Sequence, residues 1–186
     1  NLEIIVIDDC STDNTYEIIK RIGLKDNRVV VLHNEVNKER SYTRNLGIDR
    51  SKGEYIAFLD DDDEWYVDKI MKQVESIRNS NEYYAVVTSY NIKTGNNIKN
   101  IINNETKDMY IDLLSNNISL GAGSTLLISK KILLELGKFD TRFNRNEDID
   151  LMLKYLNRYK LRVMNEVLVT VYGHNSPINI EQLIIA

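Results

Sequence analysis

The sequence predicts an α/β fold built on a mostly parallel sheet with helices on its faces. Three short runs of apolar and β-branched residues are each followed by a segment with helical periodicity. These runs occupy residues 3–7, 28–32 and 54–59. A polar residue closes each run (Asp8, Asn34 and Asp60), and the even spacing of the three matches a compact strand-plus-helix unit. The pattern is typical of a Rossmann-like sheet, whose parallel strands bring their carboxyl ends to one ligand-binding edge.

Helices are predicted between and after these strands. Polar residues 11–13 are candidate N-caps for a helix that ends near Ile22. A second helix is predicted over residues 38–49. Apolar residues at helical spacing indicate a third over 67–77, ahead of a strand at 84–87. The strand–helix alternation therefore continues through the first half of the chain.

Beyond Ser89 the pattern is looser. Residues 91–104 are rich in Asn and are predicted to be exposed. Ile149, Met152 and Leu156 lie on one helical stripe, which indicates a helix beginning at Glu147. The other elements expected here are helices over 107–114 and 130–136 and strands over 124–128, 161–164 and 167–171.

The composition indicates one globular domain and argues against several classes of partner. The chain has 186 residues, of which 42% are apolar, and this is enough for one sizeable core. Lys and Arg total 24 against 28 Asp and Glu, so the net charge of -4 offers no basis for binding nucleic acid. Cys10 is the only cysteine, and no stretch has the roughly 20 apolar residues of a membrane span. A reducing, cytoplasmic location is therefore expected.

Four consecutive aspartates follow the third predicted strand, at residues 60–63. Because neighbouring carboxylates repel one another, this run favours a cation among them. Oxygen ligands suit Mg²⁺ or Mn²⁺, and Mg²⁺ commonly combines one or two carboxylates with substrate phosphates. A solvated turn that caps the next helix is the alternative. An EF-hand loop fits poorly because it requires Gly and Glu where Trp65 and Met71 stand, and no downstream motif supports an aspartate-nucleophile phosphatase.

Four segments, taken together, resemble one enzyme family. They are residues 5–13 (IVIDDCSTD), 44–48 (RNLGI), 53–65 (GEYIAFLDDDDEW) and 137–140 (GKFD), the last followed by Glu147 and Asp148. In this order and spacing they are similar to the family 2 glycosyltransferases, which have the GT-A fold. The resemblance implies a single GT-A domain over residues 1–186. Its nucleotide-binding half would cover residues 1–90, and its acceptor-binding and catalytic-base half would cover 91–186.

The family's opening strand has no counterpart in this sequence. That strand is central in a doubly wound sheet, so its absence predicts a gap in mid-sheet and a domain that is incomplete at its N-terminus. Val67 also stands where the family often has Pro at a helix start, which changes no chemistry.

By this resemblance, the aspartates at the predicted sheet edge bind the nucleotide-sugar. Asp9 would hydrogen-bond the base, in keeping with a uracil, and Asp8 would be its substitute. Without the family context, Asp9 fits a strand-end or helix-capping carboxylate equally well. Asp60, Asp61 and Asp62 match the family's Asp-x-Asp motif. Asp62 is the expected direct metal ligand, while Asp60 and Asp61 lie nearer the ribose and complete the shell of a Mg²⁺ or Mn²⁺ ion.

The resemblance also assigns the catalytic base. Asp148 matches the Asp of the family's Glu-Asp motif, which removes the proton of the acceptor hydroxyl. Acids at a helix start are otherwise explained by the helix dipole, which lowers their pKa, so burial or nearby carboxylates would have to offset it. Arg44 matches the family's Arg-Asn pair, and Arg40 lies one turn earlier, so both are candidates to reach the diphosphate. His174 resembles a histidine that some members place near the metal.

The implied reaction is sugar transfer from a nucleotide-sugar, expected to be a UDP-sugar, to an acceptor hydroxyl with inversion by direct displacement. The expected acceptor is a glycan or a lipid-linked saccharide at the inner face of the membrane. Peripheral membrane association and a homo-oligomer are both compatible with the sequence. Two other functions remain open. A nucleotidyltransferase would need a Gly-rich basic phosphate loop, which is not seen near the amino terminus, and the other is a catalytically silent nucleotide-sugar-binding module.

Overall fold

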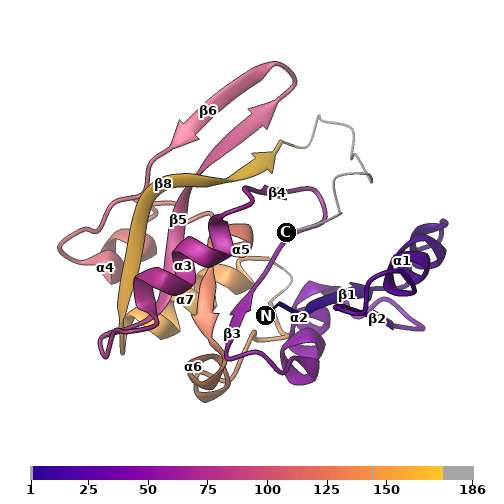
Figure 1. The fold of residues 1–186 in the computed structure, drawn as a ribbon. Coiled ribbons are helices and arrows are strands. Elements are labelled where there is room, and N and C mark those ends of the chain that lie inside the picture. Colours follow the sequence, from indigo (N-terminus) through magenta and orange to yellow (C-terminus); the bar gives the residue numbers. More distant parts are fainter. Residues whose placement is uncertain (1, 144, 174–186) are drawn as a thin grey trace.

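The computed structural model describes residues 2–143 and 145–173, which form two sheets with flanking helices (Figure 1). The smaller sheet pairs β1 (Ile4–Asp8) with β2 (Val29–His33). The larger sheet has the order β3-β7-β5-β8-β4, with β6 paired to β5. Its strands are β3 (Tyr55–Ala57), β4 (Glu64–Trp65), β5 (Tyr83–Thr94), β6 (Asn97–Ile101), β7 (Leu127–Ser129) and β8 (Lys160–Tyr172). The helices are α1 (Thr15–Gly23), α2 (Glu39–Arg50), α3 (Lys69–Ile77), α4 (Met109–Leu114), α5 (Ala122–Thr125), α6 (Lys130–Glu135) and α7 (Glu147–Leu156).

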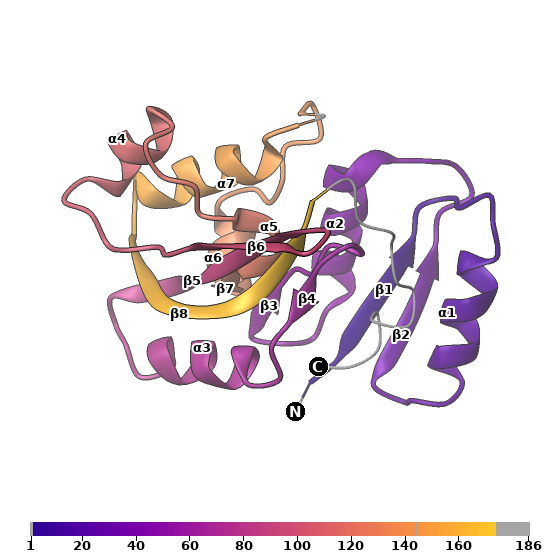
Figure 2. The ribbon, with the colours of Figure 1, turned by 90° about the horizontal axis from the view of Figure 1, so that it is seen from above.

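The layers confirm the predicted α/β class. Figure 2 shows α3 on one face of the curled larger sheet and α4 and α7 on the other, while α1 lies beside the smaller sheet. Helices thus cover both faces of the larger sheet, as the layers of an α/β fold require. No helix within residues 2–143 and 145–173 is long and apolar enough to cross a membrane.

The expectation of mostly parallel strands is wrong. Among the described strand pairs, β1–β2 and β5–β8 are parallel, whereas β3–β7, β4–β8, β5–β6 and β5–β7 are antiparallel. One of the antiparallel pairs forms within residues 91–104, which were expected to be exposed. The chain continues in β5 to Thr94, turns at Gly95 with a φ of +57°, and returns as β6. A two-residue turn joins antiparallel strands, and Asn91 and Asn103 at either end of this segment are buried.

The sheet is interrupted where the sequence predicts a gap. β1 and β3 belong to different sheets, and within the described residues β1 pairs only with β2. Helix α2 lies against the smaller sheet, since a Cβ added at Gly47 would sit 3.2 Å from Cδ1 of Ile7. The close approach of this glycine lets α2 contact β1 while its other side faces the larger sheet region.

Several element boundaries differ from the sequence prediction. Only part of the strand expected over 124–128 is a strand. Helix α5 extends to Thr125, and β7 begins at Leu127. The strands expected over 161–164 and 167–171 form one strand, β8, with register irregularities against β5. Val67 lies outside α3 and is 93% exposed, so it takes no part in the apolar face of that helix.

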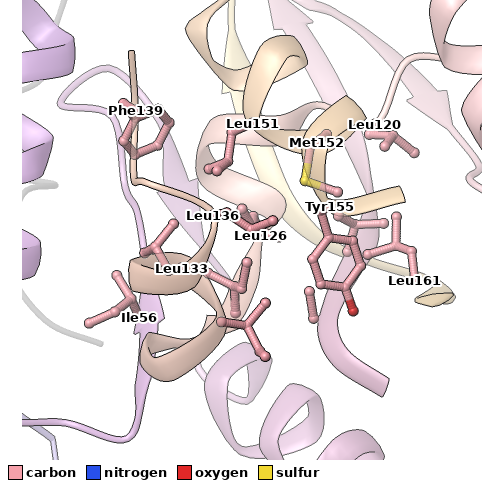
Figure 3. Packing of buried hydrophobic residues seen from close by; sticks show 14 of the residues in the cluster. Ile56, Leu120, Leu126, Leu133, Leu136, Phe139, Leu151, Met152, Tyr155 and Leu161 are labelled. Carbon is pink, nitrogen blue, oxygen red and sulfur yellow. The ribbon is translucent and has the colours of Figure 1, made fainter. Parts of the chain in front are cut away.

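The main core lies between the larger sheet and helices α6 and α7. Leu151, Met152 and Tyr155 of α7 are completely buried, as are Leu133 of α6 and Ile128 of β7. Figure 3 shows these helices packed around one continuous apolar cluster. Interiors packed in this way tolerate little displacement of a helix. The core therefore fixes α7, and with it Glu147 and Asp148 at the start of the helix.

Candidate functional site

The acidic run forms a tight turn between β3 and β4. The amide of Asp63 donates to the carbonyl oxygen of Asp60 at 3.0 Å, which closes the turn. Asp61 is exposed and Asp62 is half-buried. Of the residues expected to contact the ribose and the metal, Asp61 is thus accessible to solvent and Asp62 is partly accessible.

Arg44 of α2 joins this turn to the start of α7. Its guanidinium donates from Nη2 to Asp60 and from Nη1 to Oε1 of Glu147 at 2.9 Å. The guanidinium also lies 5.4 Å from the ring centre of Phe139 and 6.0 Å from that of Phe58. Glu147 is almost completely buried, so the guanidinium provides the opposite charge that a buried carboxylate requires. Arg44, the residue expected to contact the diphosphate, bridges two carboxylates in this structure.

Asp148 lies beside that bridge with a raised pKa. Burial raises the pKa of the Asp148 carboxyl, and the charge of Glu147 raises it further. A hydrogen bond from the Ile149 amide at 2.8 Å and the nearby Arg44 act in the opposite direction but do not cancel these effects. The helix start therefore does not leave Asp148 a weak base, because burial outweighs the stabilisation of its charge.

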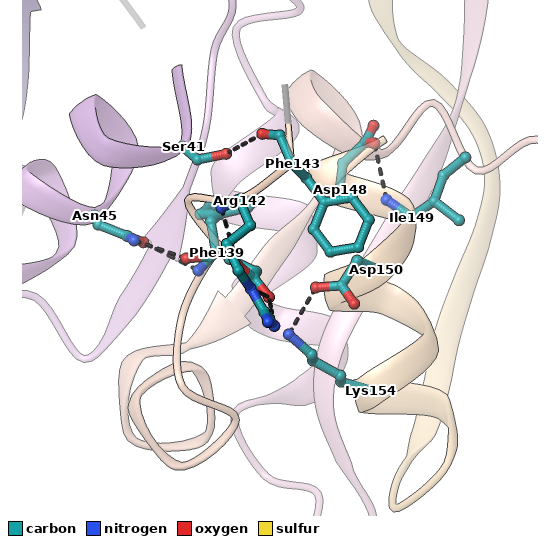
Figure 4. A network of polar contacts seen from close by, with 10 residues as sticks. Ser41, Asn45, Phe139, Arg142, Phe143, Asp148, Ile149, Asp150 and Lys154 are labelled. Atoms are coloured by element: carbon teal, nitrogen blue, oxygen red, sulfur yellow. Dashed lines mark hydrogen bonds and ion pairs between the residues drawn. The ribbon is translucent and has the colours of Figure 1, made fainter. Parts of the chain in front are cut away.

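The loop between α6 and α7 is tied to α2 by hydrogen bonds that the sequence did not suggest (Figure 4). The side chain of Asn45 donates to the carbonyl of Phe139 at 2.8 Å and accepts from its amide at 3.0 Å. The hydroxyl of Ser41 donates to the carbonyl of Phe143 at 3.2 Å. The only sequence signal for this role was the presence of Asn45 beside Arg44 in the Arg-Asn segment. Asn45 and Ser41 thus hold α2 against the segment that leads to Asp148, the candidate catalytic base.

Asp9 lies just after β1 and organises the loop that enters α2. Its Oδ1 accepts from Nδ2 of Asn34 at 2.8 Å and from the amide of Lys38 at 2.9 Å. Nδ2 of Asn34 also donates to the hydroxyl of Thr43 at 3.2 Å. The carboxylate is half-buried at the carboxyl end of the parallel pair, which is the edge where open α/β sheets bind ligands.

Asp8, the expected substitute for Asp9, occupies a different environment from its neighbour. Its side chain has no exposed surface, and Oδ2 lies 2.8 Å from Nδ1 of His33 and 3.3 Å from the amide of Ser11. Burial raises the pKa of this carboxyl, but the contacts with Ser11 and His33 outweigh burial and hold the pKa below its usual value. Asp8 is thus held within the protein by His33 and Ser11, whereas the carboxylate of Asp9 is only half-buried.

The carboxylates of the acidic turn raise one another's cost of ionisation, and the effect is seen at Asp63. Burial and the charges of Asp60 and Asp62 raise the pKa of Asp63 to about 6, although hydrogen bonds from Ser124 and Tyr172 lower it in part. Among the described residues, no group of three or more His, Cys, Asp or Glu side chains is arranged to hold a metal ion. Mg²⁺ commonly uses one or two carboxylates together with substrate phosphates, which is a smaller set of protein ligands than such a group. His174, the other expected metal neighbour, lies outside the described residues.

The chain is similar to known proteins over most of its length. A UDP-Glc:alpha-D-GlcNAc-diphosphoundecaprenol beta-1,3-glucosyltransferase of Escherichia coli, WfgD, is 31% identical over 165 residues, covering 89% of this chain and 62% of that protein. A second Escherichia coli enzyme of the same description, WfaP, is 39% identical over 90 residues, covering 48% of this chain and 35% of its own length. This chain therefore spans only part of these curated relatives.

A solved structure shares the fold. The Staphylococcus aureus TarS fragment 1–349 in complex with UDP-GlcNAc superposes with a TM-score of 0.70 at 22% identity, covering 95% of this chain and 51% of that one. This match confirms the GT-A fold. The family model described as glycosyl transferase family 2 matches residues 1–137. Because that match covers well over half of the sequence, the chain belongs to glycosyltransferase family 2.

Proposed function

We propose that this chain transfers a sugar from a UDP-sugar to an acceptor hydroxyl with inversion at the anomeric carbon. The observation that carries the proposal is the shared guanidinium of Arg44, which pairs with Asp60 of the acidic turn and with Glu147, next to Asp148. The candidate donor site and the candidate base therefore lie beside one another. WfgD and WfaP carry names that specify UDP-Glc as donor, and TarS has been solved with UDP and with UDP-GlcNAc.

Asp148 acts as the general base in this proposal. Its carboxylate accepts the proton of the acceptor hydroxyl while the acceptor oxygen bonds to the anomeric carbon. The bond between that carbon and the diphosphate oxygen breaks, and UDP leaves with its electron pair. A raised pKa suits this role, because a stronger base accepts the proton more readily as long as it is ionised at the working pH.

Asp9 and the acidic turn bind the donor. Asp9 is proposed to accept a hydrogen bond from the uracil imide, with its carboxylate held in place by Asn34 and Lys38. Asp62, with Asp60, is proposed to hold Mg²⁺ or Mn²⁺, and Asp61 to lie near the ribose. The bound cation would neutralise charge on the departing diphosphate. No second carboxylic acid is then needed to protonate the leaving group, in contrast to inverting glycoside hydrolysis.

The acceptor is proposed to be a saccharide linked to a lipid diphosphate, used in building a cell-surface polysaccharide. The names of WfgD and WfaP specify such an acceptor for those two proteins. Donor supply from the cytoplasm then places the reaction at the inner face of the membrane, with peripheral association of the protein. Assays should therefore offer a lipid-diphosphate-linked saccharide beside simple sugars.

Two variants separate binding from chemistry. Asp62→Asn should weaken UDP binding in the presence of Mn²⁺, whereas Asp148→Asn should keep UDP binding and lose transfer by about 100- to 10,000-fold. Calorimetric titration with UDP and a transfer assay with UDP-sugars check the two effects. If both variants keep full transfer activity, the site assignment is wrong. If the unmodified protein binds UDP-sugar tightly but turns over at the rate of Asp148→Asn, the chain is a binding module instead.

A further inference from the structure

One buried hydroxyl touches both ends of the acidic turn. The amide of Asp60 donates to Oγ of Ser124 at 3.1 Å, and the same Oγ donates to Oδ2 of Asp63 at 2.5 Å. Ser124 belongs to α5 and is only 2% exposed. A hydroxyl can accept one hydrogen bond and donate another at the same time, so it can join a backbone amide to a carboxylate.

The segment that follows the turn is attached to the same residue. Nε1 of Trp65 donates to the carbonyl oxygen of Ser124 at 2.7 Å. The ammonium of Lys69, a completely buried residue, lies 4.1 Å from the ring centre of the same indole. Three hydrogen bonds therefore connect residues 60–65 to one residue of α5.

Helix α5 is itself a firm support. Nε2 of Gln73, a fully buried residue of α3, donates to the carbonyl of Thr125 at 2.8 Å. The hydroxyl of Thr125 lies 2.7 Å from the carbonyl oxygens of both Leu120 and Gly121, which share its single proton. A Cβ added at Gly123 would lie 2.9 Å from Oδ2 of Asp60, so α5 approaches the acidic turn as closely as a backbone can.

We propose that Ser124 is a positioning residue that sets the geometry of the acidic turn for a metal-bound nucleoside diphosphate. This inference rests on the proposed function, because it assumes that the turn receives a divalent cation and a diphosphate. Ser124 turns the carboxylate of Asp63 inward and fixes the backbone of Asp60, which leaves Asp62 at the open part of the turn. The neighbouring negative charges would otherwise favour a wider spacing of these side chains.

The contribution of Ser124 should appear in metal-dependent binding rather than in stability alone. Pre-set ligands bind a cation and diphosphate without first having to order the turn. Without the hydroxyl, Asp63 loses a charge-assisted hydrogen bond and the amide of Asp60 loses its acceptor. Hydrogen bonds of this kind are worth about a factor of ten or more in an equilibrium constant.

The test compares Ser124→Ala with Ser89→Ala as a matched control. Ser89 of β5 is also fully buried, and its hydroxyl likewise accepts from an amide, that of Asn103, and donates to an oxygen, the carbonyl of Met164. Both substitutions should lower the thermal unfolding midpoint. UDP affinity is measured with Mn²⁺ and with EDTA, and the ratio of the two affinities is the readout.

We expect Ser124→Ala to reduce that ratio by about tenfold and Ser89→Ala to leave it unchanged. Trp65 is the only tryptophan, so the emission change on adding Mn²⁺ and UDP reports on the turn itself and should shrink in Ser124→Ala alone. An unchanged ratio and emission response in a folded Ser124→Ala protein overturns the inference while leaving the proposed function intact. If the unsubstituted protein binds UDP equally well with and without Mn²⁺, the proposed metal site is overturned, and the inference with it.

Discussion

The two sheets of this molecule differ sharply in how well they are buried. In β5 of the larger sheet, seven consecutive residues are buried, and helices cover both faces. In the smaller sheet only Asp8 is buried among the ten residues of β1 and β2, and α1 contributes a single buried residue, Ile19. The larger sheet therefore holds most of the hydrophobic stabilisation, since that stabilisation scales with the apolar area removed from water.

The difference teaches how the candidate site is built. The acidic turn and Asp148 belong to the well-buried region around the larger sheet, whereas Asp9 lies at the end of the poorly buried smaller sheet. Helix α2 connects them, through Arg44 and Asn45 on one side and Gly47 against β1 on the other. If the proposed roles are right, the core holds the acidic turn and Asp148 in place, and the edge beside Asp9 is freer to adjust around a nucleotide. Four measurements would break or sharpen this contrast.

Hydrogen exchange should show the largest difference. Amides of β1 and β2 should exchange at least about 100-fold faster than those of β5 and β8, because local opening of a sparsely packed sheet costs much less than global unfolding. Residue-resolved exchange of the protein without ligand checks this. Equal protection of β1 and β5 would show that something else covers the free edge of β1.

Truncation of a core side chain should have the next largest effect. Leu151→Ala should lower the free energy of unfolding by about 2–5 kcal/mol, because it leaves a cavity in the completely buried cluster around α7. The matched control is Leu24→Ala at the end of α1, where the side chain is 84% exposed and the change should stay within about 0.5 kcal/mol. Urea unfolding measures both. Similar losses in the two variants would contradict the unequal burial of the two regions.

Removing the carboxylate of Asp9, the candidate contact to the nucleobase, should weaken nucleotide binding but leave the core intact. Asp9→Ala should raise the dissociation constant of UDP about 10- to 100-fold, the effect expected for a lost hydrogen bond to a charged group. Asp26→Ala removes a partly exposed aspartate of the same region, paired with Arg28, and should leave UDP affinity unchanged. Isothermal titration distinguishes them. Unaltered UDP affinity in Asp9→Ala would remove Asp9 from the nucleotide site.

The smallest expected effect is a shift in pH dependence. The charge of Glu147 helps to raise the pKa of Asp148, so Glu147→Gln should lower that pKa. A base works only when ionised, and activity is lost as the pH falls through its pKa. The acid limb of kcat should therefore move to lower pH, by about one unit or less. Glu135→Gln, at an exposed residue of α6, serves as control. A limb that moves to higher pH would contradict the assignment of Asp148 as base.

The sequence predicted the α/β class and most helices because these follow from local periodicity. The helix at 38–49 and that beginning at Glu147 appear within a residue of the expected positions. Strand direction was not predictable in the same way. The β5–β6 turn and the antiparallel entry of β7 depend on which strands meet in space, and no hydrophobic period encodes that.

The candidate site divides along the same line. The family resemblance carried by the motif segments is what singles out Asp9, the acidic run and Asp148 as candidate site residues. Only the tertiary structure revealed that Asp8 is buried against His33 and that Ser124 reaches the acidic turn from 61 residues away. It also showed burial raising the pKa of Asp148 against the expected effect of a helix start. Burial and hydrogen-bond partners depend on what the rest of the chain packs against each group, and sequence spacing does not contain that information.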